Sequence, residues 1–212
     1  IEDGRATGLD VATPGEAPSQ QRFDAVIATT PSYVFPKLVP PLPKDYRSKL
    51  ESVDYMAAVL LILVLDRPLS NKYWLNVADR SIPFVGVIEQ TNLIPPEHYG
   101  GKHIVYLSNY LGDDHPLFAL DRDALLAEYL PHLRKINTDF DESWILEKYH
   151  HKVGAAQPII GTDYTSRIPD HRTPFSGVYL ANTTQVYPED RGTNYSVRMG
   201  RRVARMVIKD MA

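Results

Sequence analysis

Short apolar runs along the chain alternate with turns rich in proline and glycine, and the longest of these runs is Tyr55 to Leu65 (YMAAVLLILVL). The run is too short to span a bilayer, and its Val, Leu and Ile content is typical of a central strand buried on both faces. Further strand-like segments follow at 73–77, 84–90, 103–111 and 144–153. Together they predict a mostly antiparallel sheet around one long strand. A membrane-inserted hairpin is the alternative interpretation of the apolar run.

Helical periodicity is visible in three places. A short amphipathic helix is expected at about 44–53, and a longer one begins after Asp121 as its N-cap. The apolar face of this second helix contains Leu125, Leu126, Tyr129, Leu130 and Leu133. The third helix ends the chain, and Thr193 or Asn194 is expected to cap its start. Its predicted apolar face is Val197, Gly200, Ala204, Val207 and Met211, while Arg198, Arg201, Arg202 and Arg205 fall mainly on the other side.

The two ends of the chain carry shorter strands. Residues 1–11 predict a hairpin with a tight turn at Asp3 and Gly4, and residues 14–21 predict a further turn. Strands are then expected at 23–29 and 178–181. Neither end can bury its apolar positions alone, so we expect these two strands to lie near each other, with the last helix packed on them.

The composition narrows the function classes. The chain has 212 residues, 43% of them hydrophobic and 23% charged, with a net charge of −3, so no basic excess favours nucleic acid. The absence of cysteine excludes disulfides, thiolate metal sites and a cysteine nucleophile, and it favours a reducing, cytoplasmic location. No apolar run reaches the roughly 18 residues of a spanning helix, so an integral membrane protein is not expected. A peripheral membrane contact stays open.

Few residues outside the ends suggest chemistry. His150 and His151 are adjacent on a predicted strand and therefore point to opposite faces, which predicts one half-buried and one exposed histidine. The other histidines lack metal-ligand spacing, and we predict no metal site. No G-x-S-x-G elbow and no G-x-G-x-x-G phosphate loop occurs in the chain.

Two motifs near the ends resemble a known family. GVYLAN, followed by RGTNYSVRMGRRVA, resembles the C-terminal flavin-binding motif of the FAD-dependent amine oxidase and protoporphyrinogen oxidase superfamily. FDAVIATTP (23–31) is similar to the strand that returns the chain of those proteins to their flavin domain. AAQPIIG (155–161) resembles a segment on the substrate side of the flavin.

The resemblance implies an α+β fold. A mostly antiparallel substrate-binding domain, residues 32–175, would be inserted into the remaining pieces of an FAD/NAD(P)-binding α/β domain, residues 1–31 and 176–212. The missing glycine-rich phosphate loop would then lie upstream of Ile1.

The resemblance also implies a set of site residues. The positions that match the flavin-contacting motifs are Thr29, Thr30, Pro31, Asn182, Arg191, Gly192, Thr193, Asn194 and Tyr195. Substrate contacts are expected from Gln157 and Tyr106, and no catalytic residue can be assigned. The family usually has Gly-Asp where this chain has Asn182-Thr183, which puts in doubt the usual acidic contact to the ribityl hydroxyls.

The implied function is that of a fragment of an FAD-dependent oxidoreductase, which would oxidise a bulky, partly apolar or amine substrate by hydride transfer to flavin. The fragment alone is expected to be inactive and to bind FAD weakly or not at all. Two alternatives remain: a flavin isomerase resembling UDP-galactopyranose mutase, and a non-catalytic α+β domain that binds a ligand or partner.

Overall fold

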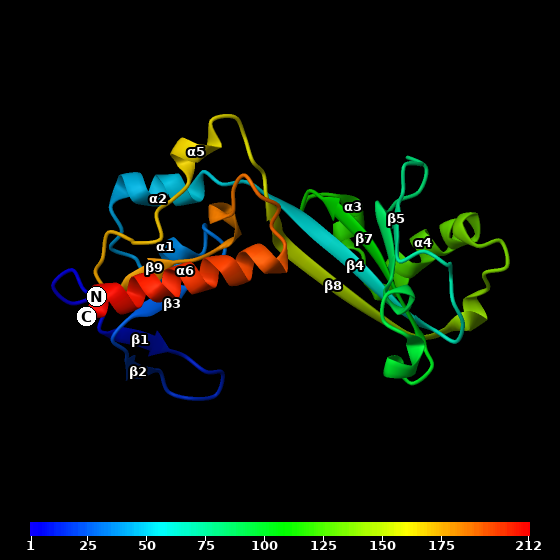
Figure 1. The fold of residues 1–212 in the computed structure, drawn as a ribbon, viewed down its shortest axis with the longest axis horizontal. Helices are drawn as coiled ribbons and strands as arrows, with labels where there is room; N and C mark the ends of the chain where they lie inside the picture. Colours follow the sequence, from blue (N-terminus) through cyan, green and yellow to red (C-terminus); the bar gives the residue numbers. More distant parts are fainter. The chain divides into compact units, whose positions relative to one another are not determined.

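The computed structural model describes all residues from 1 to 212, which form two compact units. Unit 1 combines Ile1–Asp54 with Gln157–Ala212, and unit 2 is Tyr55–Ala156 (Figure 1). These boundaries differ from the expected insertion at 32–175. The reason is packing, because Phe35 and Leu50 share one buried cluster with Leu180 and therefore belong with the chain ends.

Unit 2 is built on a five-stranded sheet. Its strands, in spatial order, are β5 (Trp74–Asn76), β6 (Gly86–Glu89), β7 (His103–Leu111), β4 (Tyr55–Leu65) and β8 (Ile145–Pro158). The first four are antiparallel neighbours, and β4 pairs with β7 along nine residues from Ala57 to Leu65. The predicted α+β class and the predicted long strand are confirmed.

The expected burial of β4 on both faces is wrong. Every second residue from Ala57 to Leu65 is fully buried, whereas Ala58, Leu60 and Ile62 between them are only half-buried. The strand therefore has one core face and one partly open face, as antiparallel strands commonly do. Continuous apolar character misled the prediction, because both faces of this strand are apolar.

The core face of the sheet packs against α4 (Arg122–Ile136). Asp121 caps this helix as predicted, with its carboxylate accepting from the backbone N–H groups of Asp123 and Ala124 at 3.0 and 2.9 Å. Leu125, Leu126, Tyr129 and Leu133 are buried in the core. His150 is half-buried and His151 exposed, as their positions on β8 predicted.

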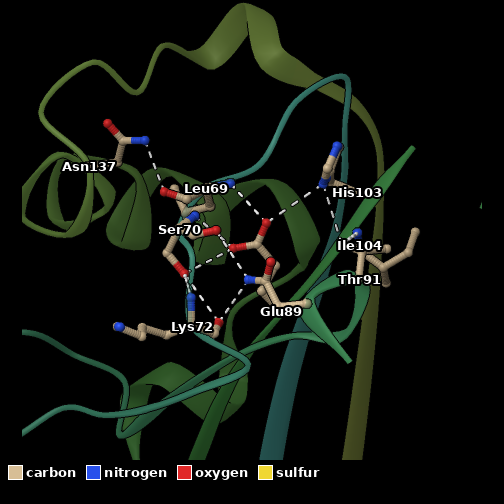
Figure 2. A network of polar contacts seen from close by, with 9 residues as sticks. Leu69, Ser70, Lys72, Glu89, Thr91, His103, Ile104 and Asn137 are labelled. Carbon is tan, nitrogen blue, oxygen red and sulfur yellow. Dashed lines mark hydrogen bonds and ion pairs between the residues drawn. The ribbon is translucent and has the colours of Figure 1, made fainter. Parts of the chain in front are cut away.

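A buried carboxylate holds the end of this sheet together (Figure 2). Glu89 on β6 is fully buried, and its oxygens accept from the backbone N–H groups of Leu69 and Ser70 at 3.0 and 2.7 Å. The hydroxyl of Ser70 donates to the same carboxylate at 3.0 Å, and Nδ1 of His103 lies 3.8 Å from it. The Glu89 carboxylate thus ties the turn after β4 to β6 and to the start of β7.

Unit 1 has three layers. The parallel pair β3 (Val26–Ala28) and β9 (Val178–Leu180) forms the middle. On one side the pair packs against α1 (Phe35–Leu38) and α2 (Lys44–Glu51), and on the other against α6 (Thr193–Met211). Figure 1 shows α6 running alongside these strands. The predicted packing of the two chain ends is therefore confirmed.

The remaining elements are short. A turn with positive φ at Asp3 and Gly4 joins two bridged residues, as predicted. The hairpin that follows was missed: β1 (Gly8–Val11), expected to pair across the turn at Asp3 and Gly4, pairs instead with β2 (Ser19–Arg22), most of which was expected to be a turn. The other elements are η1 (Gln90–Asn92), η2 (Pro96–Tyr99), α3 (Pro116–Ala119), η3 (Glu142–Trp144), α5 (Tyr164–Arg167) and η4 (Thr183–Gln185). None of the helices has both the length and the apolar content needed to cross a bilayer.

The predicted apolar face of α6 is partly wrong. The helix packs through Met199, Val203, Met206 and Val207 on the side chains of Tyr179 and Ala181. Val197 and Met211, which the periodicity placed on the buried face, are 53% and 49% exposed. The helix carries two neighbouring apolar stripes, and only tertiary packing decides which of them is covered.

Candidate functional site

The carboxyl ends of β3 and β9 lie side by side in unit 1. The parallel register pairs Ala28 with Leu180, and the backbone N–H of Ala181 donates to the carbonyl of Ala28 at 2.9 Å. Thr29, Thr30 and Pro31 therefore follow one strand next to Asn182, which follows the other. Ligands of open α/β sheets bind outside the carboxyl ends of the strands, so this edge is the place to look for a cofactor site.

Asn182 joins the two strand ends. Its side-chain amide donates to the carbonyl of Thr30 at 2.9 Å and to Oγ of Ser32 at 3.2 Å. Its Oδ1 accepts from the backbone N–H of Thr184 at 3.1 Å and from the hydroxyl of Thr184. Because Asn182 is 5% exposed, these contacts use its side chain almost completely. An aspartate could not make the two donations, which gives a physical reason for Asn at this position.

Ser32 and Thr184 also belong to the hydrogen-bond network that connects the two strand ends, and the sequence did not point to either of them. Both side chains are fully buried, and their hydroxyl oxygens lie 3.1 Å apart. One sequence signal could have found the turn: Asn182 and Gln185 form a capping box, in which Oε1 of Gln185 accepts from the backbone N–H of Asn182 at 2.9 Å.

The start of α6 is open to an anion. Gly192 is the N-cap, in place of the predicted Thr193 or Asn194, and it offers no side-chain cap to the first N–H groups of the helix. These N–H groups and the positive end of the helix dipole favour negative charge. Thr193 and Asn194 are exposed, and Tyr195 is half-buried.

Two buried polar atoms in this part of unit 1 lack a protein partner: Oγ1 of Thr30 and Nε of Arg191. A buried donor without an acceptor is costly, so such atoms commonly mark contacts to a bound group. The guanidinium of Arg191, immediately before α6, is suited to a phosphate oxygen. A flavin dinucleotide, which carries a pyrophosphate and a polyol chain, fits this donor set.

The other candidate surface is the face of the unit 2 sheet opposite the core face that packs on α4. The registers place Ile62, Ile88 and Tyr106 side by side on three neighbouring strands. The other residues that share this face are Ala58, Leu60, Ile104, Ser108, Tyr110 and Trp74. Trp74 and Tyr110 are 55% and 45% exposed. We call this surface the second face of the sheet; it is mainly apolar and aromatic.

This second face carries almost no charge. None of β4, β5, β6 and β7 contains Lys, Arg or Asp, and the one Glu among them is the fully buried Glu89. On β8, the carboxylate of Glu147 accepts from the hydroxyl of Tyr149 and pairs with Lys102 at 2.9 Å. The hydrogen bond from Tyr149 and then that from Lys102 hold the pKa of Glu147 below its usual range. The acid is thus already paired within the protein.

The two expected substrate contacts fall in different units. Tyr106 lies on the second face of the sheet in unit 2. Gln157 lies near the end of β8 in unit 1, and its buried Oε1 has no partner in the protein. Gln157 therefore keeps a free acceptor at the end of the longest strand.

Comparison with known proteins identifies the family. The sequence pattern described as "Flavin containing amine oxidoreductase" matches residues 2–208. The chain belongs to the flavin-containing amine oxidoreductase family. This family is one of flavin-dependent oxidoreductases. No curated protein sequence matches the chain significantly.

Solved structures with the same fold include an oxidoreductase, a putrescine oxidase and a UDP-galactopyranose mutase. An oxidoreductase from Methanosarcina mazei is similar at 19% identity and a TM-score of 0.66, and the match covers 95% of this chain and 47% of the Methanosarcina chain. Putrescine oxidase bound to putrescine is similar at 16% identity and a TM-score of 0.68, and the match covers 96% of this chain and 46% of the putrescine oxidase chain. Reduced UDP-galactopyranose mutase is similar at 13% identity and a TM-score of 0.54, and the match covers 71% of this chain and 33% of the mutase chain. The chain thus spans about half the length of the first two structures, and identities this low show the fold alone.

Proposed function

We propose that this chain forms the substrate-facing sheet and the last cofactor-facing loop of an FAD-dependent oxidoreductase. The observation that carries the proposal is the second face of the sheet, which is broad and apolar and has no charged side chain on β4 to β7 apart from the buried Glu89. Solvated sheet faces are usually polar, so a face of this composition indicates that something apolar covers it. In a family of flavin-dependent oxidoreductases, a bulky substrate suits this surface.

Within unit 1, the residues that would hold FAD are those at the strand ends and at the start of α6. A bound flavin supplies the capacity to accept two electrons as a hydride from the substrate. The Arg191 guanidinium and the first N–H groups of α6 would bind phosphate oxygens, and the Thr30 hydroxyl would donate to a polar group of the cofactor. Thr29, Pro31, Gly192, Thr193, Asn194 and Tyr195 would line this part of the site.

We assign Asn182 a positioning role. Its side chain is occupied by Thr30, Ser32 and Thr184, so it acts on the cofactor through the loop that it fixes. In this role it sets the distance between the end of β3 and the loop that leads into α6. The acidic ribityl contact typical of the family would then have no counterpart at this position.

The substrate group that meets the sheet would be neutral. A cationic amine needs an unpaired carboxylate, and a sugar-nucleotide diphosphate needs arginines. The second face offers neither, because Glu89 is saturated with donors and no arginine lies on β4 to β7. This argues for an apolar or aromatic substrate body and against the isomerase alternative. If an amine is oxidised, groups beyond this sheet must bind its charge.

We further propose that the 212-residue chain binds FAD weakly and has no activity of its own. It offers a few donors at the start of α6 but no glycine-rich phosphate loop. Each 1.4 kcal/mol of missing contact lowers the affinity about tenfold. Titrating the purified chain with FAD and following flavin fluorescence tests this, and micromolar or tighter binding would contradict it.

The function itself is tested with the natural polypeptide that contains this sequence, purified with its flavin. Anaerobic reduction of the flavin is followed with three groups of compounds. The first is aromatic and long-chain alcohols, the second is aromatic and long-chain amines, and the third is short diamines. Apolar compounds are expected to reduce the flavin fastest, and Tyr106→Ala should raise their KM about tenfold through lost apolar contact. Tyr99→Ala, outside the strands, is the matched control. Faster reduction by a short diamine, or equal effects of both variants, would contradict the proposal.

A further inference from the structure

The segment that leads from β9 to α6, residues 182–191, is positioned mainly by side chains. We call this segment the β9–α6 loop. Its first part contains the turn η4, whereas the backbone groups of residues 187–191 make no hydrogen bond with another segment of the chain. This second part ends at Arg191, whose guanidinium is proposed to bind a phosphate oxygen. The position of Arg191 therefore depends on contacts that other residues of the loop make.

Tyr164 contacts the loop at two points. It is the first residue of α5, and its side chain is 1% exposed. Its hydroxyl donates to the backbone carbonyl of Thr184 at 2.7 Å. Its ring meets the ring of Tyr187 edge to face, with centroids 5.4 Å apart and planes at 62°. One side chain thus fixes both the turn η4 and the first residue of the part that lacks backbone hydrogen bonds.

Gln185 connects the loop to the same support. Its Nε2 donates to the carbonyl of Pro169, just beyond α5, at 3.1 Å, while its Oε1 accepts from the backbone N–H of Asn182. The stretch before α5 is itself anchored, because the backbone N–H of Ile159 donates to the carbonyl of Asp54 at 2.8 Å. All these residues belong to unit 1.

The contacts of Tyr164 do not depend on what covers the surface of unit 1. Tyr164, Thr184 and Pro169 are all buried by residues of this chain. The carbonyl of Thr184 is buried with them, so the loss of its donor would leave an unsatisfied acceptor unless the loop moved to find another partner. Such a movement would displace the residues that follow Thr184 in the loop.

We propose that Tyr164 is a positioning residue for flavin binding. This proposal rests on the proposed function, and it adds a residue that acts through the β9–α6 loop and does not touch the cofactor. By holding Thr184 and Tyr187, Tyr164 keeps the loop in the arrangement that presents Nε of Arg191 and the first N–H groups of α6 to phosphate oxygens. The apparent affinity for a ligand falls in proportion to the fraction of molecules in the binding arrangement. Loss of the Tyr164 hydroxyl should therefore weaken FAD binding.

The first measurement is amide hydrogen exchange in the natural polypeptide that contains this sequence, freed of its flavin. Tyr164→Phe removes only the hydroxyl, and it should accelerate exchange at Thr184, Gln185 and Val186 about fivefold while exchange at β9 is unchanged. Tyr46→Phe is the matched control, because the Tyr46 hydroxyl is also buried in unit 1 but has no partner. Unchanged exchange in the loop of Tyr164→Phe, or equal acceleration at β9, would overturn the proposal.

The second measurement is the Kd of the same flavin-free proteins for FAD, under conditions in which all of them are fully folded. Tyr164→Phe should raise this Kd about fivefold, as expected for the loss of one neutral hydrogen bond, and Tyr46→Phe should bind like the natural protein. A purely structural role of Tyr164 would lower stability without changing this Kd. An unchanged Kd for Tyr164→Phe would overturn the positioning role and leave the proposed function intact. A natural polypeptide that bound no FAD would overturn both.

Discussion

The two units of this protein are stabilised in different ways. Unit 2 has one large apolar core, in which alternate residues of β4 and β7 pack against α4. Unit 1 has two smaller clusters on either side of two three-residue parallel strands, and a buried asparagine ties the strand ends together. The difference follows from chain connectivity. Unit 2 is one continuous stretch, whereas unit 1 must join segments about 150 residues apart. Where little apolar area is available, specific hydrogen bonds decide the geometry.

The two units can also be observed separately. Both tryptophans, Trp74 and Trp144, lie in unit 2, so tryptophan fluorescence during urea unfolding reports on that unit. Amide hydrogen exchange at β9 reports on unit 1. The predictions below use this pair of measurements.

The largest effect is expected from Leu61→Ala. Leu61 is fully buried in the core of unit 2, and truncating such a side chain lowers the free energy of unfolding by about 3 kcal/mol. Leu60→Ala, one residue earlier on the second face, removes the same atoms from a half-buried site and should lower it by about 1 kcal/mol. Equal shifts of the fluorescence transition would show that both faces of β4 are covered.

A smaller loss is expected from Asn182→Ala, this time in unit 1. The change leaves the buried groups of Ser32 and Thr184 without their amide partner, which should destabilise unit 1 by about 2 to 3 kcal/mol. Faster exchange at β9 with an unchanged fluorescence transition is the expected result. Asn194→Ala, an exposed asparagine of the same unit, is the control. A shift of both signals together would show that the two units unfold as one.

Glu89→Gln tests the buried carboxylate of unit 2, which fixes the turn after β4 as Asn182 fixes the strand ends of unit 1. The amide group of Gln would face the N–H groups of Leu69 or Ser70, so one donor loses its acceptor and the unit should lose about 1 to 2 kcal/mol. The fluorescence midpoint should fall while exchange at β9 is unchanged. The exposed Glu142→Gln serves as the reference. An unchanged midpoint for Glu89→Gln would mean that the turn after β4 is held by its apolar contacts.

The smallest effect concerns pH. Hydrogen bonds from Arg122 and then from Lys148 lower the pKa of Asp123 to about 2. Because this folded-state pKa lies below the ordinary value of about 3.9, its contribution to unit 2 is present above about pH 4 and is lost as the pH falls toward 2. Asp123 is exposed, so Asp123→Asn should change Tm only slightly and make Tm less dependent on pH below about pH 4. Glu128→Gln, which removes another exposed carboxylate from the same helix, is the control.

Local patterns predicted unit 2 well. The run of large apolar residues determined β4, alternation determined β7, and Asp121 determined the start of α4, because each of these signals depends on neighbouring residues alone. The hairpin β1–β2 was missed, since its strands are short and mostly exposed.

The sequence by itself determined the α+β class, the long central strand and, through its two end motifs, the resemblance to flavin-dependent oxidoreductases. Tertiary structure decided what depends on distant neighbours. It placed Asn182 between Thr30, Ser32 and Thr184, and it left Nε of Arg191 without a partner. It also buried Val203 and exposed Val197 on the same helix. Periodicity specifies that a helix has apolar stripes, but only packing against β9 determines which stripe is covered.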